Sequence, residues 1–210
     1  MRSILLGSLL ALTTSMVIPA VQAAPYTAGK EYVELAAPVA VSDSSKVEVV
    51  ELFWYGCPHC YQFEPTLEPW VAQLPEDVSF KRIPAMFGGV WNLHGQVFLT
   101  LEQMQVDPSV HKAIFDALHQ QGLRLSTIDS MADFLANKGV DKETFLKTYN
   151  SFAIKRQVES AKKLAMQYQI TGVPVMIVDG KYRFDLGTAG GPEAALQVAD
   201  FLIEQERSTR

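Results

Sequence analysis

The sequence ELFWYGCPHCYQFEPTLEPW, residues 51–70, contains the only two cysteines of the 210-residue chain, Cys57 and Cys60. The residues before them, SKVEVVELFWY at 45–55, are mostly apolar and include β-branched side chains, which is typical of a strand buried on both faces. After Cys57, Pro58 fits the first position of a helix, and apolar residues then recur at helical spacing. The cysteine pair is therefore predicted to lie where a buried strand passes into a helix.

A cysteine just before the first helical position is well placed to be a reactive thiolate. Unpaired backbone N–H groups and the helix dipole favour negative charge there, and His59 in the first turn can add a positive charge or a hydrogen bond. A lower thiol pKa stabilises the reduced form, which makes the corresponding disulfide a stronger oxidant. We therefore predict Cys57 as the attacking sulfur and Cys60, one turn deeper, as the resolving sulfur. The Pro58-His59 pair between them favours an oxidase over a reductase.

Three other uses of the cysteine pair are less well supported. A zinc site would need two further ligands, and no second ligand pair has the spacing of a zinc finger; the available histidines are His59, His94, His111 and His119. A c-type haem site needs histidine directly after the second cysteine, where Tyr61 stands. A purely structural disulfide would close a very short loop, contributing about 2 kcal/mol against about 3 kcal/mol for a loop of about fifteen residues. Redox chemistry explains the pair better.

The first 23 residues have the parts of a secretory signal peptide. Arg2 supplies positive charge, residues 4–20 form an apolar stretch, and VQA precedes a predicted cleavage after Ala23. Polar residues at 13–15 interrupt the apolar stretch, which favours a cleaved signal over an uncleaved membrane anchor. We expect an exported, soluble mature protein. The formal net charge of −5 and the absence of a basic cluster argue against a nucleic-acid partner.

The remaining patterns predict the order of the other elements. VSFKRIP at 78–84 is typical of a second strand, and helical spacing dominates from there until a hairpin at 173–186 and a last helix opened by Pro192. This order predicts an α/β fold with a mixed sheet, formed by residues 24–87 and 152–210. An all-helical domain, residues 88–151, is predicted to be inserted after the second strand.

The motif CPHCYQFE at 57–64, followed far downstream by TGVP at 171–174, resembles the DsbA family of bacterial periplasmic thiol oxidases. The resemblance covers nearly the whole chain and implies a thioredoxin-like fold with an inserted helical domain. It also implies that Pro174 is cis and lies against the cysteines, and that Val173 pairs its backbone with an extended substrate segment. Without the resemblance, Pro174 would be assigned trans, because cis is the minority isomer.

The resemblance further implies charged residues that modulate the thiols. Glu51 would lie beneath the cysteines, where it would move protons, with Glu64 and Lys81 nearby. A buried carboxylate is costly unless it is paired, so a contact between Glu51 and Lys81 across adjacent strands is an expectation. The alternative for each of the three is a solvated charge with a minor effect.

Several other features are expected to serve packing. The tryptophans and most methionines are predicted to be core residues, and His94, His111 and His119 to be surface or hydrogen-bonded histidines. Phe87 and Met176 are the exceptions, because they could line an apolar groove beside the cysteines. The sequence departs from the best-known DsbA proteins at three prolines. Pro65 and Pro69 are expected to interrupt and kink the first helix, and Pro84 lies at the exit of the second strand. These departures are expected to affect the shape of the groove rather than the chemistry.

The sequence therefore predicts a monomeric, cofactor-free periplasmic oxidase that donates its Cys57–Cys60 disulfide to reduced exported proteins. The resemblance implies reoxidation by a membrane quinone-linked partner of the DsbB type. A disulfide isomerase or reductase is the alternative within redox chemistry, although no separate dimerisation domain precedes the first core strand. From another class, the chain could be a peptide-binding chaperone module whose cysteines are not used.

Overall fold

The computed structural model describes residues 25–210, so the predicted signal peptide lies outside the described residues. Within residues 25–210, one sheet has the strand order β1-β5-β4-β2-β3. The strands are β1 (Val33–Glu34), β2 (Val47–Phe53), β3 (Val78–Pro84), β4 (Val175–Val178) and β5 (Tyr182–Asp185). Strands β2 and β3 are parallel and the other pairs are antiparallel, so the predicted mixed sheet is confirmed.

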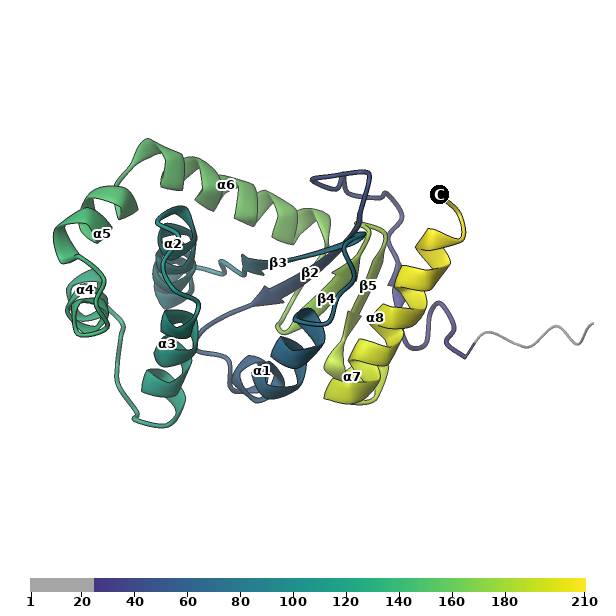
Figure 1. Ribbon diagram of the computed structural model, residues 1–210, viewed down its shortest axis with the longest axis horizontal. Helices are drawn as coiled ribbons and strands as arrows, with labels where there is room; N and C mark the ends of the chain where they lie inside the picture. The colour runs from purple at the N-terminus through teal and green to yellow at the C-terminus, as the bar shows by residue number, and fades with distance from the viewer. Residues whose placement is uncertain (1–24) are drawn as a thin grey trace, which may run out of the picture.

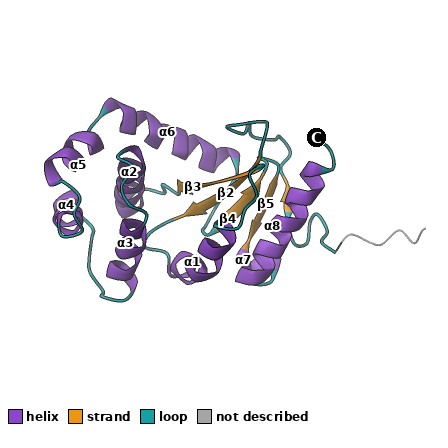
Figure 2. Cartoon of the chain, in the orientation of Figure 1, coloured by secondary structure: helices purple, strands orange, loops and turns teal. Residues whose placement is uncertain are grey.

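Helices cover both faces of this sheet (Figure 1). Helices α1 (Pro58–Val71), α7 (Leu186–Ala189) and α8 (Pro192–Arg207) pack on one face, and α6 (Phe152–Gln167) packs on the other. Between β3 and α6 the chain forms α2 (Gly89–Gln103), α3 (Ser109–His119), α4 (Ile128–Ala136) and α5 (Lys142–Tyr149). Figure 2 shows these four helices gathered beyond the β2–β3 side of the sheet. The proposed boundaries of an inserted domain at 88–151 stay a prediction.

Every residue of β2 is buried, as the apolar run predicts. Val47 and Val49 pack in the core beneath α1 and α8, whereas Val50 and Leu52 pack in the core beneath α6. A third apolar cluster, formed largely by α2 to α5, reaches Phe53 and the cysteines that follow it. The strand-to-helix junction therefore lies where the sheet meets the helical segment.

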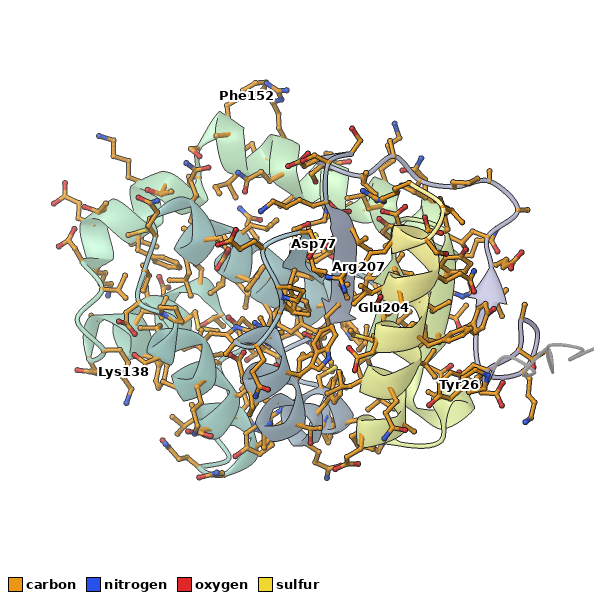
Figure 3. All side chains as sticks on the ribbon, turned by 45° about the vertical axis from the view of Figure 1, so that its right-hand side comes forward. Tyr26, Asp77, Lys138, Phe152, Glu204 and Arg207 are labelled. Carbon is orange, nitrogen blue, oxygen red and sulfur yellow. The ribbon has the colours of Figure 1, made fainter. Side chains whose placement is uncertain are left out.

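The last helix is tied to the beginning of β3 at the surface. Arg207 of α8 donates hydrogen bonds to both carboxylate oxygens of Asp77, at 2.6 and 2.7 Å (Figure 3). Asp77 immediately precedes β3, so this ion pair joins two elements that are 130 residues apart in sequence. Because both side chains are partly exposed to solvent, the pair contributes only about 0–1 kcal/mol to stability.

The predicted element order is confirmed, with two short additions, β1 and α7. Helix α1 continues to Val71 with both Pro65 and Pro69 inside it, and the kink expected at these prolines stays a prediction. Pro84 ends β3, an edge strand with β2 as its neighbour, where a missing N–H is tolerated.

Candidate active site

The two cysteines occupy different environments at the start of α1. Cys57 is the N-cap residue and has extended backbone angles, φ −87° and ψ 115°, while Pro58 takes the first helical position. The Cys60 backbone N–H donates a hydrogen bond to Cys57 Sγ at 3.2 Å, and both thiols are free. Cys60 is fully buried, whereas Cys57 is 6% exposed. Cys57 is therefore the sulfur that a partner can reach.

The surroundings of the two sulfurs separate their acidities. The pKa of Cys57 is lowered to about 6, because the Cys60 side chain and the N–H groups of Cys60 and His59 hydrogen-bond to its sulfur, with a smaller contribution from the charge of His59; burial acts in the opposite direction. Burial raises the pKa of Cys60 well above its usual value, and the hydrogen bond with Cys57 and the charge of Glu51 add to this rise. These directions support an attacking Cys57 and a resolving Cys60.

The distal Val-Pro pair lies against Cys57. The peptide bond between Val173 and Pro174 is cis, as the family resemblance implies. The Cys57 thiol lies 3.5 Å from the carbonyl oxygen of Val173, close enough for a hydrogen bond that sulfur donates. Beside these residues is an open cavity of about 930 Å³, whose lining includes His59, Val173, Pro174, Gly190 and Gly191. An extended peptide laid along this cavity would meet the Val173 backbone next to the reactive sulfur.

Glu51 lies in β2, on the same face of the sheet as α1. Its carboxylate is fully buried and accepts a hydrogen bond from Arg82 Nε at 2.9 Å, while Oε1 has no hydrogen-bond partner. Burial raises the pKa of Glu51 to about 8; Arg82 acts to lower this pKa and the nearby Glu64 to raise it. The acid is therefore largely protonated at neutral pH and has a proton to give.

Glu64 completes a cluster of charges around Arg82. Arg82 Nη2 lies 3.2 Å from Glu64 Oε1 and 2.6 Å from Glu68 Oε1, and His111 Nε2 lies 3.8 Å from Glu64 Oε2. Burial acts to raise the pKa of Glu64, but its interactions with His111 and the charge of Arg82 outweigh burial, so this pKa lies below its usual value. One guanidinium thus serves three carboxyl groups. Its charge acts to lower the pKa of Glu51, but burial, helped by the charges of Glu64 and Glu68, outweighs it and keeps Glu51 protonated.

Comparison with known proteins places this arrangement in a family. A family model described as a DSBA-like thioredoxin domain matches residues 92–194. The thiol:disulfide interchange protein DsbA of Pseudomonas aeruginosa is 64% identical over 208 residues, which cover 99% of this chain and 98% of that protein. The protein of the same name from Azotobacter vinelandii is 60% identical over 214 residues, and the match covers both chains completely. The chain belongs to the DsbA family.

A solved structure of P. aeruginosa DsbA is also similar, with a TM-score of 0.86 and 67% identity over 88% of this chain and 96% of that one. The fold is therefore the DsbA-like thioredoxin fold, as the cysteine motif and the distal Val-Pro imply, and the chain is a dithiol–disulfide oxidoreductase. Among the described residues, no helix is long and apolar enough to cross a bilayer. Within residues 25–210, no three side chains of His, Cys, Asp or Glu gather closely enough to hold a metal ion.

The expected ion-pair partner of Glu51 was wrong by one residue. In the parallel register of β2 and β3, Glu51 lies opposite Arg82, whereas Lys81 lies opposite Val50 on the other face of the sheet. Lys81 Nζ instead contacts Glu48 at 2.8 Å. The contact predicted between Glu51 and Lys81 was therefore wrong. Alternation in the second strand, where Val78 and Phe80 are the inward apolar residues, could have placed Arg82 on the face of Glu51.

Three other residues that the sequence singles out lie at different depths in the fold. Glu64 is buried, so the alternative of a solvated charge was wrong for this residue. Met176 is fully buried in the sheet core, so its predicted place in a groove was wrong. Phe87 is 46% exposed and packs on Trp91. His111 is a residue that sequence reasoning missed, since only the fold brings α3 beside Glu64.

Proposed function

We propose that this DsbA-family protein oxidises pairs of cysteine thiols in reduced exported proteins. The observation that carries the proposal is the Cys57 thiolate at the N-terminus of α1, with its pKa lowered to about 6. A disulfide whose reduction yields a stabilised thiolate accepts electrons readily, so the pair is suited to oxidising other dithiols.

The reaction proceeds in two exchanges that carry two electrons. A client thiolate attacks Cys57 Sγ of the Cys57–Cys60 disulfide; a client–Cys57 bond forms, the bond to Cys60 breaks, and Cys60 leaves as a thiolate. A second client thiolate then attacks the client sulfur of this mixed disulfide. The client disulfide forms, and Cys57 leaves as a thiolate. The client is oxidised by two electrons and the protein is reduced by two.

Glu51 is proposed to supply the proton that Cys60 needs. The pKa of Cys60 is raised strongly by burial, so its thiolate takes up a proton as soon as it is released. Glu51 is protonated at neutral pH, because burial raises its pKa to about 8. Arg82 and Glu64 are proposed to tune this acid, whereas Lys81 acts on the other face of the sheet.

The client is proposed to bind in an extended conformation. The cavity beside Val173 and Pro174 would hold its backbone, and the exposed Pro58 and His59 would lie next to the incoming sulfur. We also propose that the protein acts in the periplasm as a monomer. A membrane quinone-linked oxidase of the DsbB type would restore its disulfide.

Trapping of the mixed disulfide tests the proposal. The Cys60→Ser variant is first activated at Cys57 as a mixed disulfide with a small thiol. A reduced, unfolded client that has a single cysteine should then form a stable covalent complex through Cys57, because its thiolate attacks Cys57 Sγ and the small thiol leaves. The Cys57→Ser variant is the matched control and should form none. If Cys57→Ser retains the effect of the wild-type protein on client refolding, the protein acts as a chaperone module and the oxidase proposal fails. An isomerase would rearrange scrambled disulfides without oxidising a simple dithiol peptide.

A further inference from the structure

A tight turn delivers Cys57 to the helix. The Cys57 backbone N–H donates to the carbonyl oxygen of Trp54 at 2.9 Å, which closes a four-residue turn with Tyr55 and Gly56 at its centre. The central peptide of such a turn has two alternative orientations, and the type II orientation requires a positive φ at the third residue. Glycine adopts positive φ at little cost, so Gly56 leaves both orientations open. In this structure, Gly56 does not have a positive φ.

Packing, rather than the turn itself, explains why residue 56 is a glycine. A Cβ atom placed on Gly56 would lie 2.3 Å from the Trp54 indole, which folds back over this residue. The indole is in turn stacked on Trp91, with ring centroids 3.9 Å apart. Glycine is therefore needed at residue 56 to make room for the stacked indole rings. Because glycine also leaves the backbone free to adopt either turn, another group must select the orientation of the peptide between Tyr55 and Gly56.

His119, the last residue of α3, contacts that peptide. His119 Nε2 lies 2.7 Å from the carbonyl oxygen of Tyr55, which is the oxygen of the central peptide. A carbonyl oxygen only accepts, so Nε2 carries the proton and donates. If the peptide turned over, the N–H of Gly56 would replace this oxygen and two donors would face each other. His119 therefore stabilises the observed orientation and opposes the other.

The imidazole is itself held in place from the other end of the motif. The ring of Tyr61, which directly follows Cys60, stacks on His119 with centroids 5.0 Å apart and planes 11° apart. The Tyr61 hydroxyl donates to Asp116 of α3 at 3.0 Å. Figure 1 shows α3 beside the beginning of α1. Helix α3 thus contacts residues on both sides of the Cys57–Cys60 segment.

We propose that His119 is a positioning residue for Cys57, which locks the central peptide of the preceding turn and so keeps the cysteine where backbone N–H groups stabilise its thiolate. This inference rests on the proposed function, in which the client attacks Cys57 and Cys57 then leaves as a stabilised thiolate. The hydrogen bond at Cys57 Sγ depends on the direction of the Cys57 backbone, and the turn sets that direction. Loss of the His119 donor would let the turn sample its other form and weaken the bonds to the thiolate.

Two substitutions separate the hydrogen bond from the stacking. His119→Phe keeps an aromatic ring against Tyr61 but removes the donor, whereas His119→Gln keeps an N–H at a similar distance from the backbone. The Cys57 thiolate pKa is measured from absorbance at 240 nm across pH, and the redox equilibrium is measured in glutathione buffers. His119→Phe should raise the pKa by about half a unit to one unit. From a pKa of about 6, this makes the protein's disulfide about two- to fivefold less oxidising at pH 7.

The measured pKa values distinguish failure of this inference from failure of the proposed function. A raised pKa in His119→Phe with a pKa close to wild type in His119→Gln supports the inference. An unchanged pKa and redox equilibrium in a folded His119→Phe variant overturns it, even if that variant is less stable. A wild-type pKa near that of a free thiol overturns the proposed function instead. If His119→Phe does not fold, nitrogen NMR of the wild-type protein decides: the neutral ring must carry its proton on Nε2, and a proton on Nδ1 would overturn the inference.

Discussion

Replacing Glu51 by glutamine should stabilise the reduced protein at neutral pH. Glu51 is fully buried, and burial raises its pKa from 4.5 to about 8. The folded state therefore holds this proton more tightly than the unfolded state does. Stability is lost as the pH rises from about 4.5, where the unfolded carboxyl ionises, to about 8, where the folded one does. Glutamine has nearly the same shape but no proton to lose.

The size of the gain follows from the two pKa values. Between pH 4.5 and pH 7 the cost of keeping Glu51 protonated grows by about 1.4 kcal/mol per unit, which amounts to about 3 kcal/mol at pH 7. For a chain of this size, that gain raises the melting temperature by roughly 6–12 °C. Arg82 keeps its contacts with Glu64 and Glu68 in the variant, so it is not left unpaired.

Urea unfolding of the reduced wild-type and Glu51→Gln proteins, at pH 4.5 and at pH 7, measures the effect. The difference in free energy of unfolding should be near zero at pH 4.5 and about 3 kcal/mol in favour of the variant at pH 7. A variant that is less stable than wild type at pH 7 would refute the reasoning. In that case Glu51 would be ionised, and its ion pair with Arg82 would stabilise the fold.

Two further predictions compare matched substitutions. Arg82→Met should lower the free energy of unfolding by about 3–5 kcal/mol, because it leaves the buried Glu64 carboxylate without its guanidinium. Lys162→Met, which removes the partner of the exposed Glu159, should cost about 0–1 kcal/mol, and equal losses by urea unfolding would contradict the reasoning. Gly56→Ala should displace the Trp54 ring, changing the near-ultraviolet circular dichroism and costing about 1–3 kcal/mol. Gly172→Ala, whose Cβ meets nothing within 4 Å, should change neither, and an unaltered spectrum in Gly56→Ala would show that Trp54 does not occupy this place.

The local parts of the site could be predicted from the sequence because their causes are local. The position of Cys57 before Pro58 depends on a strand-to-helix junction that apolar patterning and one proline indicate, and the structure places it at the N-cap. The greater burial of Cys60 follows from its place one turn further along the helix. The cis bond at Pro174 was expected only from the family resemblance, because sequence preferences favour trans.

The parts that were missed depend on strand register and on contacts between distant segments. The register between β2 and β3 decides whether Lys81 or Arg82 contacts the buried Glu51, because a shift of one residue in the register moves every side chain of the strand to the opposite face of the sheet. His119 contacts a carbonyl 64 residues earlier in the chain, and no local pattern distinguishes it from a surface histidine. The two-residue strand β1 is too short to have a period.

The proposed oxidase activity depends most on the stability of the reduced form, which the Cys57 thiolate is expected to provide. The decisive measurement is the equilibrium between the oxidised and reduced forms of the protein without residues 1–23 in glutathione buffers, together with urea unfolding of both forms. We predict that the disulfide is readily reduced by glutathione and that the reduced form is the more stable at pH 7. A disulfide that resists reduction, with the oxidised form the more stable, would contradict the account and indicate a reductase built on the same fold.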